Sequence, residues 1–136
     1  MAKTEHTSVQ VEYMHLCDYA FQSDRGKPGI IGIFDSITCP SFPSGHPLMC
    51  IAVQLRGQAG HVVPIRLVLE APNGEKLVDL PEQQVTLSPA GSAFINANLM
   101  GVPLKSPGRY SVLVMSQGAV LASVTMKVVK AEVRAA

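Results

Sequence analysis

Apolar and polar residues alternate along most of this chain, which is the pattern of a β-strand with one face on a core. No segment follows the 3.6-residue period of an amphipathic helix. The alternation predicts strands at 9–20, 30–38, 48–56, 62–71, 76–80, 84–87, 93–100, 109–115 and 120–129. About nine short strands, separated by clusters of Pro, Gly, Asn and Ser, predict an all-β fold, an antiparallel β-sandwich.

The last two predicted strands form the clearest hairpin. Ser106-Pro107-Gly108 makes a turn, Tyr110 opens one strand, and Gly118 leads into the next. A tyrosine near the start of the penultimate strand resembles the one that ties the corner of immunoglobulin-like sandwiches. Asn73-Gly74 predicts another hairpin with a type I′ turn, because these residue types accept positive φ.

The sequence also predicts how the chain is divided. Residues 1–8 are polar and are predicted to form an arm, and residues 9–136 to form a single sandwich domain. From Pro47 onward the chain resembles a seven-strand immunoglobulin-like domain, to which the strands at 9–20 and 30–38 are added. Beyond Tyr13 the first strand is apolar on both faces, as expected in a packed interior or an interface.

Two local features interrupt the strand pattern. Gly32 lies inside a predicted strand, which indicates a bulge or a close approach to the backbone. The segment Cys39–Pro47 contains three prolines, and each proline removes a hydrogen-bond donor and fixes φ. We therefore expect Cys39–Pro47 to be an irregular loop.

Composition predicts an aliphatic core and a surface that other subunits cover. Hydrophobic residues make up 47% of the chain and Trp is absent, so Val, Ile, Leu, Ala and Met must fill the core. Charged residues are only 15% and the mean hydropathy is +0.24. Such a surface favours self-association or a protein partner.

Charge and cysteine content limit the partners and the compartment. The net charge is +1 with scattered basic residues, so we expect no nucleic acid and no membrane as partner. No apolar run follows Lys3 as in a signal peptide, and no stretch has the length of a membrane helix. The three cysteines, Cys17, Cys39 and Cys50, are irregularly spaced. Free thiols in a reducing cytoplasm are the prediction.

Three short motifs stand in a specific order: Cys17-Asp18-Tyr19-Ala20, Ile31-Gly32-Ile33-Phe34-Asp35, and Ser41-Phe42-Pro43 with His46-Pro47. In this order the chain resembles a family of small bacterial proteins catalogued as a domain of unknown function. The resemblance extends from Val11 to Val129. It implies the sandwich fold and implies no activity, cofactor or catalytic residue.

A metal site is conceivable at Cys39, His46 and Cys50, which Cys17 could join, because these are zinc-ligand types. Their spacing lacks a paired C-x2-C element, and Cys17 and Cys50 also fit the strand pattern as small core residues. We therefore predict no metal and no cofactor.

The sequence supports a catalytic site even less than it supports a metal site. A Cys nucleophile with His15 or His46 as base would need hydrogen-bond contact and an oxyanion hole, and the sequence identifies neither. Asp18 and Asp35 could meet if the first two strands pair, but Asp at strand ends more often caps turns. The Gly26–Gly29 segment lacks the phosphate-loop pattern. These observations predict that the protein is not an enzyme.

The Ser41–Pro47 loop is the strongest candidate for recognition, with Phe42 and His46 as its binding residues. Rigid, proline-framed loops present aromatic side chains at low entropic cost. The alternative is that Phe42 plugs one end of the sandwich, and the sequence favours neither.

The sequence therefore predicts a non-enzymatic sandwich that associates with itself or with another protein. One alternative is a structural component of a larger particle, such as a cage, a filament or a virus-shell decoration. A further alternative is a small-ligand or metal-dependent enzyme, which a polar pocket around His46, Asp18 or Cys39 would support.

Overall fold

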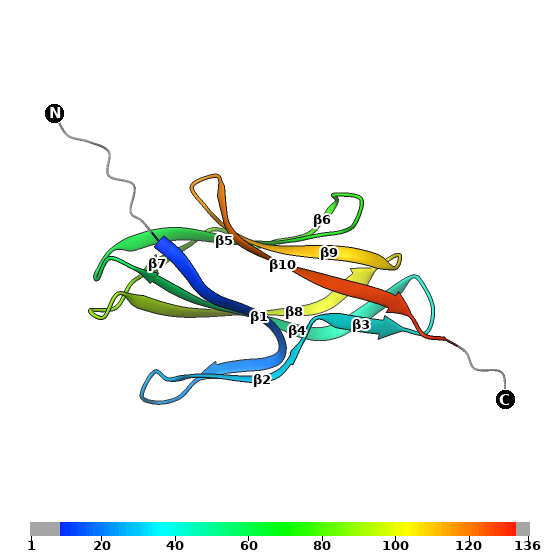
Figure 1. The fold of residues 1–136 in the computed structure, drawn as a ribbon, viewed down its shortest axis with the longest axis horizontal. Helices are drawn as coiled ribbons and strands as arrows, with labels where there is room; N and C mark the ends of the chain where they lie inside the picture. Colours follow the sequence, from blue (N-terminus) through cyan, green and yellow to red (C-terminus); the bar gives the residue numbers. More distant parts are fainter. Residues whose placement is uncertain (1–8, 133–136) are drawn as a thin grey trace.

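A computed structural model describes residues 9–132, which form ten β-strands and no helix (Figure 1). The strands are β1 (Val9–Gln22), β2 (Pro28–Phe34), β3 (Ser36–Cys39), β4 (Ser44–Gly57), β5 (Val62–Glu70), β6 (Lys76–Asp79), β7 (Gln83–Thr86), β8 (Ser92–Leu104), β9 (Gly108–Ser116) and β10 (Ala119–Lys130). The predicted arm at residues 1–8 lies outside the described range. Within that range no helix could cross a membrane.

The strands form two sheets that pack face to face. The four-stranded sheet has the order β2-β1-β4-β8, and the six-stranded sheet has the order β3-β10-β9-β5-β6, with β7 also paired to β5. Every pairing is antiparallel except that of β3 with β10, which is parallel. The predicted immunoglobulin-like β-sandwich is confirmed.

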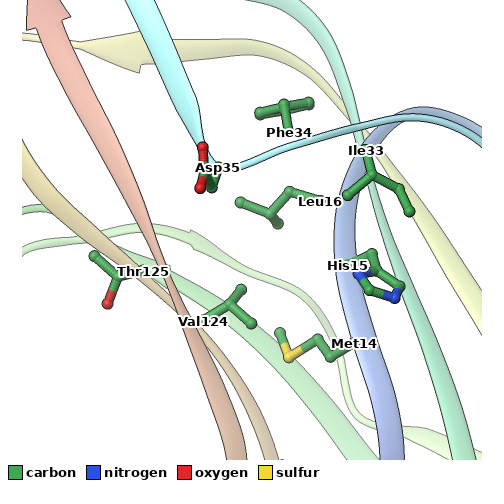
Figure 2. Close-up of a pocket in the computed structure, with 8 residues that line it drawn as sticks. All are labelled: Met14, His15, Leu16, Ile33, Phe34, Asp35, Val124 and Thr125. Carbon is green, nitrogen blue, oxygen red and sulfur yellow. The ribbon is translucent and has the colours of Figure 1, made fainter.

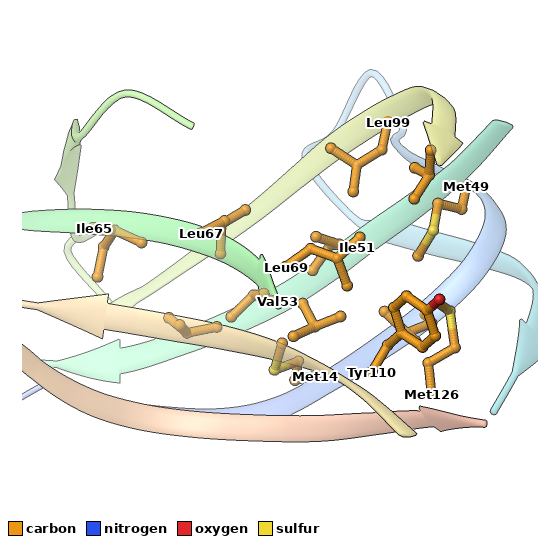
Figure 3. Close-up of a cluster of buried hydrophobic side chains, with 14 of the residues drawn as sticks. Met14, Met49, Ile51, Val53, Ile65, Leu67, Leu69, Leu99, Tyr110 and Met126 are labelled. Atoms are coloured by element: carbon orange, nitrogen blue, oxygen red, sulfur yellow. The ribbon is translucent and has the colours of Figure 1, made fainter. Parts of the chain in front are cut away.

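The buried side chains of the main core lie between the sheets and are aliphatic or sulfur-containing, apart from that of Tyr110 (Figure 3). Strand β9 shows how the period-two pattern builds it: Tyr110, Val112 and Val114 are buried, whereas Ser111 and Leu113 between them are partly exposed. Tyr110 is the aromatic residue of this core, and its hydroxyl donates a hydrogen bond to the Ser106 carbonyl oxygen at 2.7 Å.

The prediction of one strand at 30–38 is wrong, because the chain changes sheet at Asp35. Strand β2 ends at Phe34 and pairs with β1, while β3 begins at Ser36 and pairs with β10. The Lys127 amide donates to the Asp35 carbonyl oxygen at 2.9 Å and holds the crossover in place. Phe34 and Ile37 both pack on the main core, so the apolar pattern continues across the break. The described chain therefore has ten strands where about nine were predicted.

Strand β1 extends the four-stranded sheet beyond β4, and seven strands, β4 to β10, follow from Ser44 onward in the described range. It lies between β2 and β4 in the four-stranded sheet. It pairs with β4 from Val9 to Cys17 and with β2 from Leu16 to Gln22.

The predicted irregular loop at Cys39–Pro47 is shorter than expected, because β4 begins at Ser44 and includes His46 and Pro47. A proline is tolerated in a strand where its missing N–H has no partner. Pairing of β1 with β4 stops at Cys50, so one side of β4 at Pro47 has no paired strand in the described part of the chain.

The turn prediction at Asn73-Gly74 is right for the hairpin and wrong for its type. Gly74 has φ +88°, but Asn73 keeps negative φ and its side-chain oxygen accepts the Glu75 amide at 3.0 Å. A type I′ turn needs positive φ at both central residues. That geometry occurs instead at Gln117 and Gly118, with φ of 52° and 79°, between β9 and β10.

The hairpin formed by the second half of β1 and β2, residues 17–33, covers the outer face of the four-stranded sheet. In Figure 1, β1 curves sharply and β2 lies beyond β4 and β8. The Asn96 side chain on β8 donates to the Ala20 carbonyl oxygen at 3.0 Å. A second cluster, consisting of Cys17, Ala20, Cys50 and Ala52 with Ile30 and Phe94, fills the space between hairpin and sheet. This extra layer explains why β1 is apolar on both faces beyond Tyr13.

Candidate functional site

The bend of β1 and the crossover at Asp35 bring several predicted site residues to one corner of the sandwich. Two open cavities lie there, and Phe34 lines both of them. The corner exists because β2 belongs to one sheet and β3 to the other.

The first cavity, of about 310 Å³, lies between β1 and β10 (Figure 2). Its lining residues are Met14, His15, Leu16, Ile33, Phe34, Asp35, Val124 and Thr125. It is open because β2 pairs with β1 only from Leu16 onward and β3 pairs with β10 only from Lys127 onward. The His15 ring stacks on Tyr13, with centroids 5.5 Å apart.

The second cavity, of about 320 Å³, is here named the Asp18–His46 pocket and lies beside β3 and the start of β4. Asp18, Phe34, Ser36, Ile37, Thr38 and His46 line it. The Phe34 and His46 rings lie 6.0 Å apart. On β3, Ser36 and Thr38 are exposed while Ile37 between them is buried, so both hydroxyl side chains are on the outward face.

The absence of a side chain at Gly32 allows the Asp18 carboxylate to lie against strand β2. The φ of Gly32 is +72°, and a Cβ atom there would collide with the Asp18 carboxylate oxygen. The predicted close approach to Gly32 is therefore made by a side chain from the neighbouring strand. A residue with a side chain at position 32 would displace Asp18 from this position.

The other predicted site residues do not gather. Cys39 belongs to the main core and Cys50 to the second cluster, whereas His46 lies in the pocket. Within residues 9–132 no three His, Cys, Asp or Glu side chains converge in a metal-binding arrangement. Phe42 packs against the main core, which is the position expected of a plug.

Sequence reasoning missed an exposed apolar surface on the hairpin. Its four large side chains, named here the hairpin face, are Tyr19, Phe21, Ile31 and Ile33, with exposed fractions of 52%, 37%, 57% and 58%. Tyr19 pairs with Ile31 across the two strands, and its ring stacks on Phe21 with centroids 5.6 Å apart. The sequence showed that the first strand is apolar on both faces beyond Tyr13, as in a packed interior or an interface, but it did not show which side chains stay exposed.

A model of a family of unknown function, DUF6941, matches residues 12–129. The chain belongs to this family. The resemblance to a family without an assigned function is thereby confirmed. Comparison with curated protein sequences finds no match for this DUF6941 chain.

Solved structures similar to the DUF6941 chain share its fold at low identity. The alkylpurine DNA glycosylase AlkC of Pseudomonas fluorescens has a TM-score of 0.60 and 11% identity over 91% of this chain, which spans 31% of the glycosylase. A β-D-glucoside glucohydrolase of Trichoderma reesei has a TM-score of 0.54 and 12% identity, covering 90% of this chain and 19% of that enzyme. A CARDB domain from Pyrococcus furiosus, solved with two metal ions, has a TM-score of 0.50 and 14% identity, covering 96% and 100% of the respective chains. These likenesses show the sandwich fold alone.

Two of the thiols of the DUF6941 chain, those of Cys17 and Cys50, lie buried next to each other. Cys17 and Cys50 are fully buried and pair across β1 and β4, and the Cys17 thiol donates to the Cys50 carbonyl oxygen at 3.6 Å. Burial raises the pKa of Cys17 to about 12, and the charge interaction with Cys50 adds to the rise. Burial likewise raises the pKa of Cys50. With raised pKa values both sulfurs hold their protons near neutral pH, whereas nucleophilic attack requires the thiolate.

We expect these thiols to make the free energy of unfolding depend on pH in the alkaline range. Because the pKa of Cys17 rises on folding from 9.0 to about 12, the folded state retains a proton that the unfolded chain loses. The free energy of unfolding should therefore fall as pH rises from about 9 toward 12. Urea unfolding at stepped pH measures this slope, and Cys17→Ala should reduce it. An equal slope in both proteins would show that Cys17 is not the source.

Proposed function

We propose that this DUF6941 protein is a non-enzymatic sandwich module that associates with a second copy of itself through the hairpin face. The observation that carries the proposal is the exposure of four large apolar side chains, Tyr19, Phe21, Ile31 and Ile33, on one hairpin. Apolar area that stays in water is unfavourable, and its burial drives association.

The size of the hairpin face favours a reversible dimer. Its exposed fractions amount to the area of about two whole side chains, or roughly 400 Å² per copy at about 200 Å² each. A stable interface usually buries about 800 Å² on each partner. Polar residues of the turn at 23–27 can supply part of the remaining rim. We therefore expect association that depends on protein concentration.

A second copy is the occupant that the chemistry favours, because the hairpin face is uncharged and therefore complementary to itself. Two copies related by a twofold axis would bury Ile31 and Ile33 without removing an ion from water. Pairing along the edge of β2 is less favourable. Pro28 lacks a donor, and Gly32 departs from strand geometry at φ +72°, so both interrupt that edge. We infer face-to-face packing of the two hairpins.

The non-enzymatic part of the proposal rests on the chemistry of the corner. The buried thiols hold their protons, as their raised pKa values indicate. Ser36, His46 and Asp18 are the residue types of a hydrolase triad and line one pocket. No hydrogen bond joins them in the described residues, whereas a nucleophile needs one to its base.

Replacement of Ile31 by glutamate tests self-association. Wild-type protein should show a mass that rises from monomer to dimer over a concentration series in multi-angle light scattering. Ile31→Glu should remain monomeric, because association would bury an unpaired carboxylate. The loss in affinity should be at least about a hundredfold, equivalent to roughly 3 kcal/mol.

Val62→Glu is the matched control. Val62 is 53% exposed, close to the 57% of Ile31, and lies on β5 in the other sheet. This variant should associate like the wild type. A wild-type chain that stays monomeric at every concentration would rule out self-association, and equal effects of the two substitutions would exclude the hairpin face as the interface.

A further inference from the structure

Four polar side chains from three strands line the Asp18–His46 pocket. Asp18 comes from β1, Ser36 and Thr38 from β3, and His46 from β4. Within residues 9–132 these side chains make no hydrogen bond and no ion pair. Convergent polar groups in a concave site, with apolar neighbours, are the usual composition of a small-ligand site.

We infer that this pocket binds the ammonium group of a small primary amine. Asp18 is the one formally charged residue of its lining, which contains no Lys or Arg. Lys127 pairs with Ser36 in the sheet register but does not line the pocket. The charge of the site therefore favours a cation and disfavours phosphate or carboxylate groups.

The hydrogen-bonding groups match an ammonium ion. A carboxylate only accepts hydrogen bonds, hydroxyl oxygens accept them, and a neutral imidazole has one accepting nitrogen. An ammonium group has three donors and no acceptor, so its donors match the accepting atoms that Asp18 and the two β3 hydroxyls offer. The Phe34 ring adds an aromatic face for a cation.

The remaining lining accommodates a short aliphatic chain better than a metal ion. Phe34 and Ile37 are apolar, and the volume of about 320 Å³ suits a molecule of several heavy atoms. Calcium and magnesium require several oxygen ligands. This pocket offers one carboxylate, and the described residues hold no cluster of three metal-ligating side chains.

Gly32 allows the Asp18 carboxylate to be preorganised for ligand binding. With φ of +72° and no Cβ, Gly32 lets the carboxylate lie against the neighbouring strand. This contact places the carboxylate beside the pocket before a ligand arrives, which lowers the entropic cost of binding.

Titration with n-butylamine tests the inference by two-dimensional amide NMR. The butylammonium ion should give saturable shifts at Asp18, Ser36, Thr38 and His46. n-Butanol has the same chain without charge and n-butyrate has the opposite charge, so both should bind at least about tenfold more weakly. Calcium should give no saturable shifts at these residues.

Two variants of the full chain locate the site. Asp18→Asn keeps the shape of the side chain and should weaken butylammonium binding about tenfold, because a charge-assisted hydrogen bond is lost. Asp35→Asn removes a carboxylate from the other cavity at the same corner and should leave the affinity unchanged. Well-dispersed spectra of both variants verify that they fold.

Several outcomes would overturn the inference. These are binding of n-butanol as tight as that of butylammonium, saturable binding of calcium alone, unchanged affinity in Asp18→Asn, or an equal loss in Asp35→Asn. An absence of saturable shifts in the wild-type protein would also overturn it. None of these outcomes depends on self-association, which the hairpin variants test separately.

Discussion

Replacement of Tyr110 by alanine should lower the free energy of unfolding by about 4 kcal/mol, the usual cost of removing a large buried aromatic side chain. The ring is 1% exposed and belongs to the main core, opposite Met126 on β10 (Figure 3). The loss is close to the lower end of the total stability of natural domains, which is about 5–15 kcal/mol.

The Tyr110→Phe variant separates the hydroxyl from the ring. In the wild-type protein the Tyr110 hydroxyl donates to the Ser106 carbonyl oxygen at 2.7 Å. Loss of this hydrogen bond should lower the free energy of unfolding by about 1–1.5 kcal/mol. Urea unfolding with linear extrapolation measures both variants. If phenylalanine proved as costly as alanine, the hydrogen bond and not the packed ring would hold this corner.

Replacement of Gly91 by alanine should destabilise the fold by about 3 kcal/mol, through backbone strain and a collision. Gly91 has φ +77°, and a Cβ there would strike the Gly57 carbonyl oxygen. The Gly57 amide also donates to the Gly91 carbonyl oxygen at 2.9 Å. The two segments are therefore tied together, and neither can move away cheaply.

Gly60→Ala is the matched control for this collision. Gly60 has the same φ of +77°, and a Cβ there would meet nothing within 4 Å. It should cost only the strain of the left-handed conformation, about 1 kcal/mol. Thermal or urea unfolding of the two variants gives the difference, which we expect to be about 2 kcal/mol. Equal losses would show that the Gly91 contact relaxes freely.

The strands could be predicted from the sequence wherever one face of the strand is buried and the other is exposed to solvent. Strand β9 is the clearest case, because Tyr110, Val112 and Val114 alternate with partly exposed residues. The crossover at Asp35 could not be predicted in this way. Phe34 and Ile37 pack on one core from different sheets, and alternation reports burial but not the strand that provides it.

The candidate site depended on this crossover and on the folding back of the hairpin. Asp18 and His46 were each noticeable in the sequence, but they line one pocket only because β3 leaves the sheet of β2. Cys39 and Cys50 are near in sequence and lie in different clusters, since Cys39 faces the main core whereas Cys50 lies on the side of β4 that the hairpin covers. Proximity along the chain was a poor guide to proximity in space.

The exposure of the hairpin face was the least predictable feature. Ile31 and Ile33 have the residue type of a core strand, and in the structure they face solvent. Their neighbour Ile30 packs on the second cluster instead. A distorted position at Gly32 and a bend in β1 decide which side of the hairpin is buried, and neither has a signature in the hydrophobic pattern.

The measurement that tests self-association most directly is the concentration dependence of the amide NMR spectrum. We predict shifts that grow with protein concentration at residues 19–22 and 28–33, whereas amides of β5 and β9 in the other sheet stay unchanged. A spectrum that is independent of concentration, or shifts confined to the six-stranded sheet, would contradict association through the hairpin face.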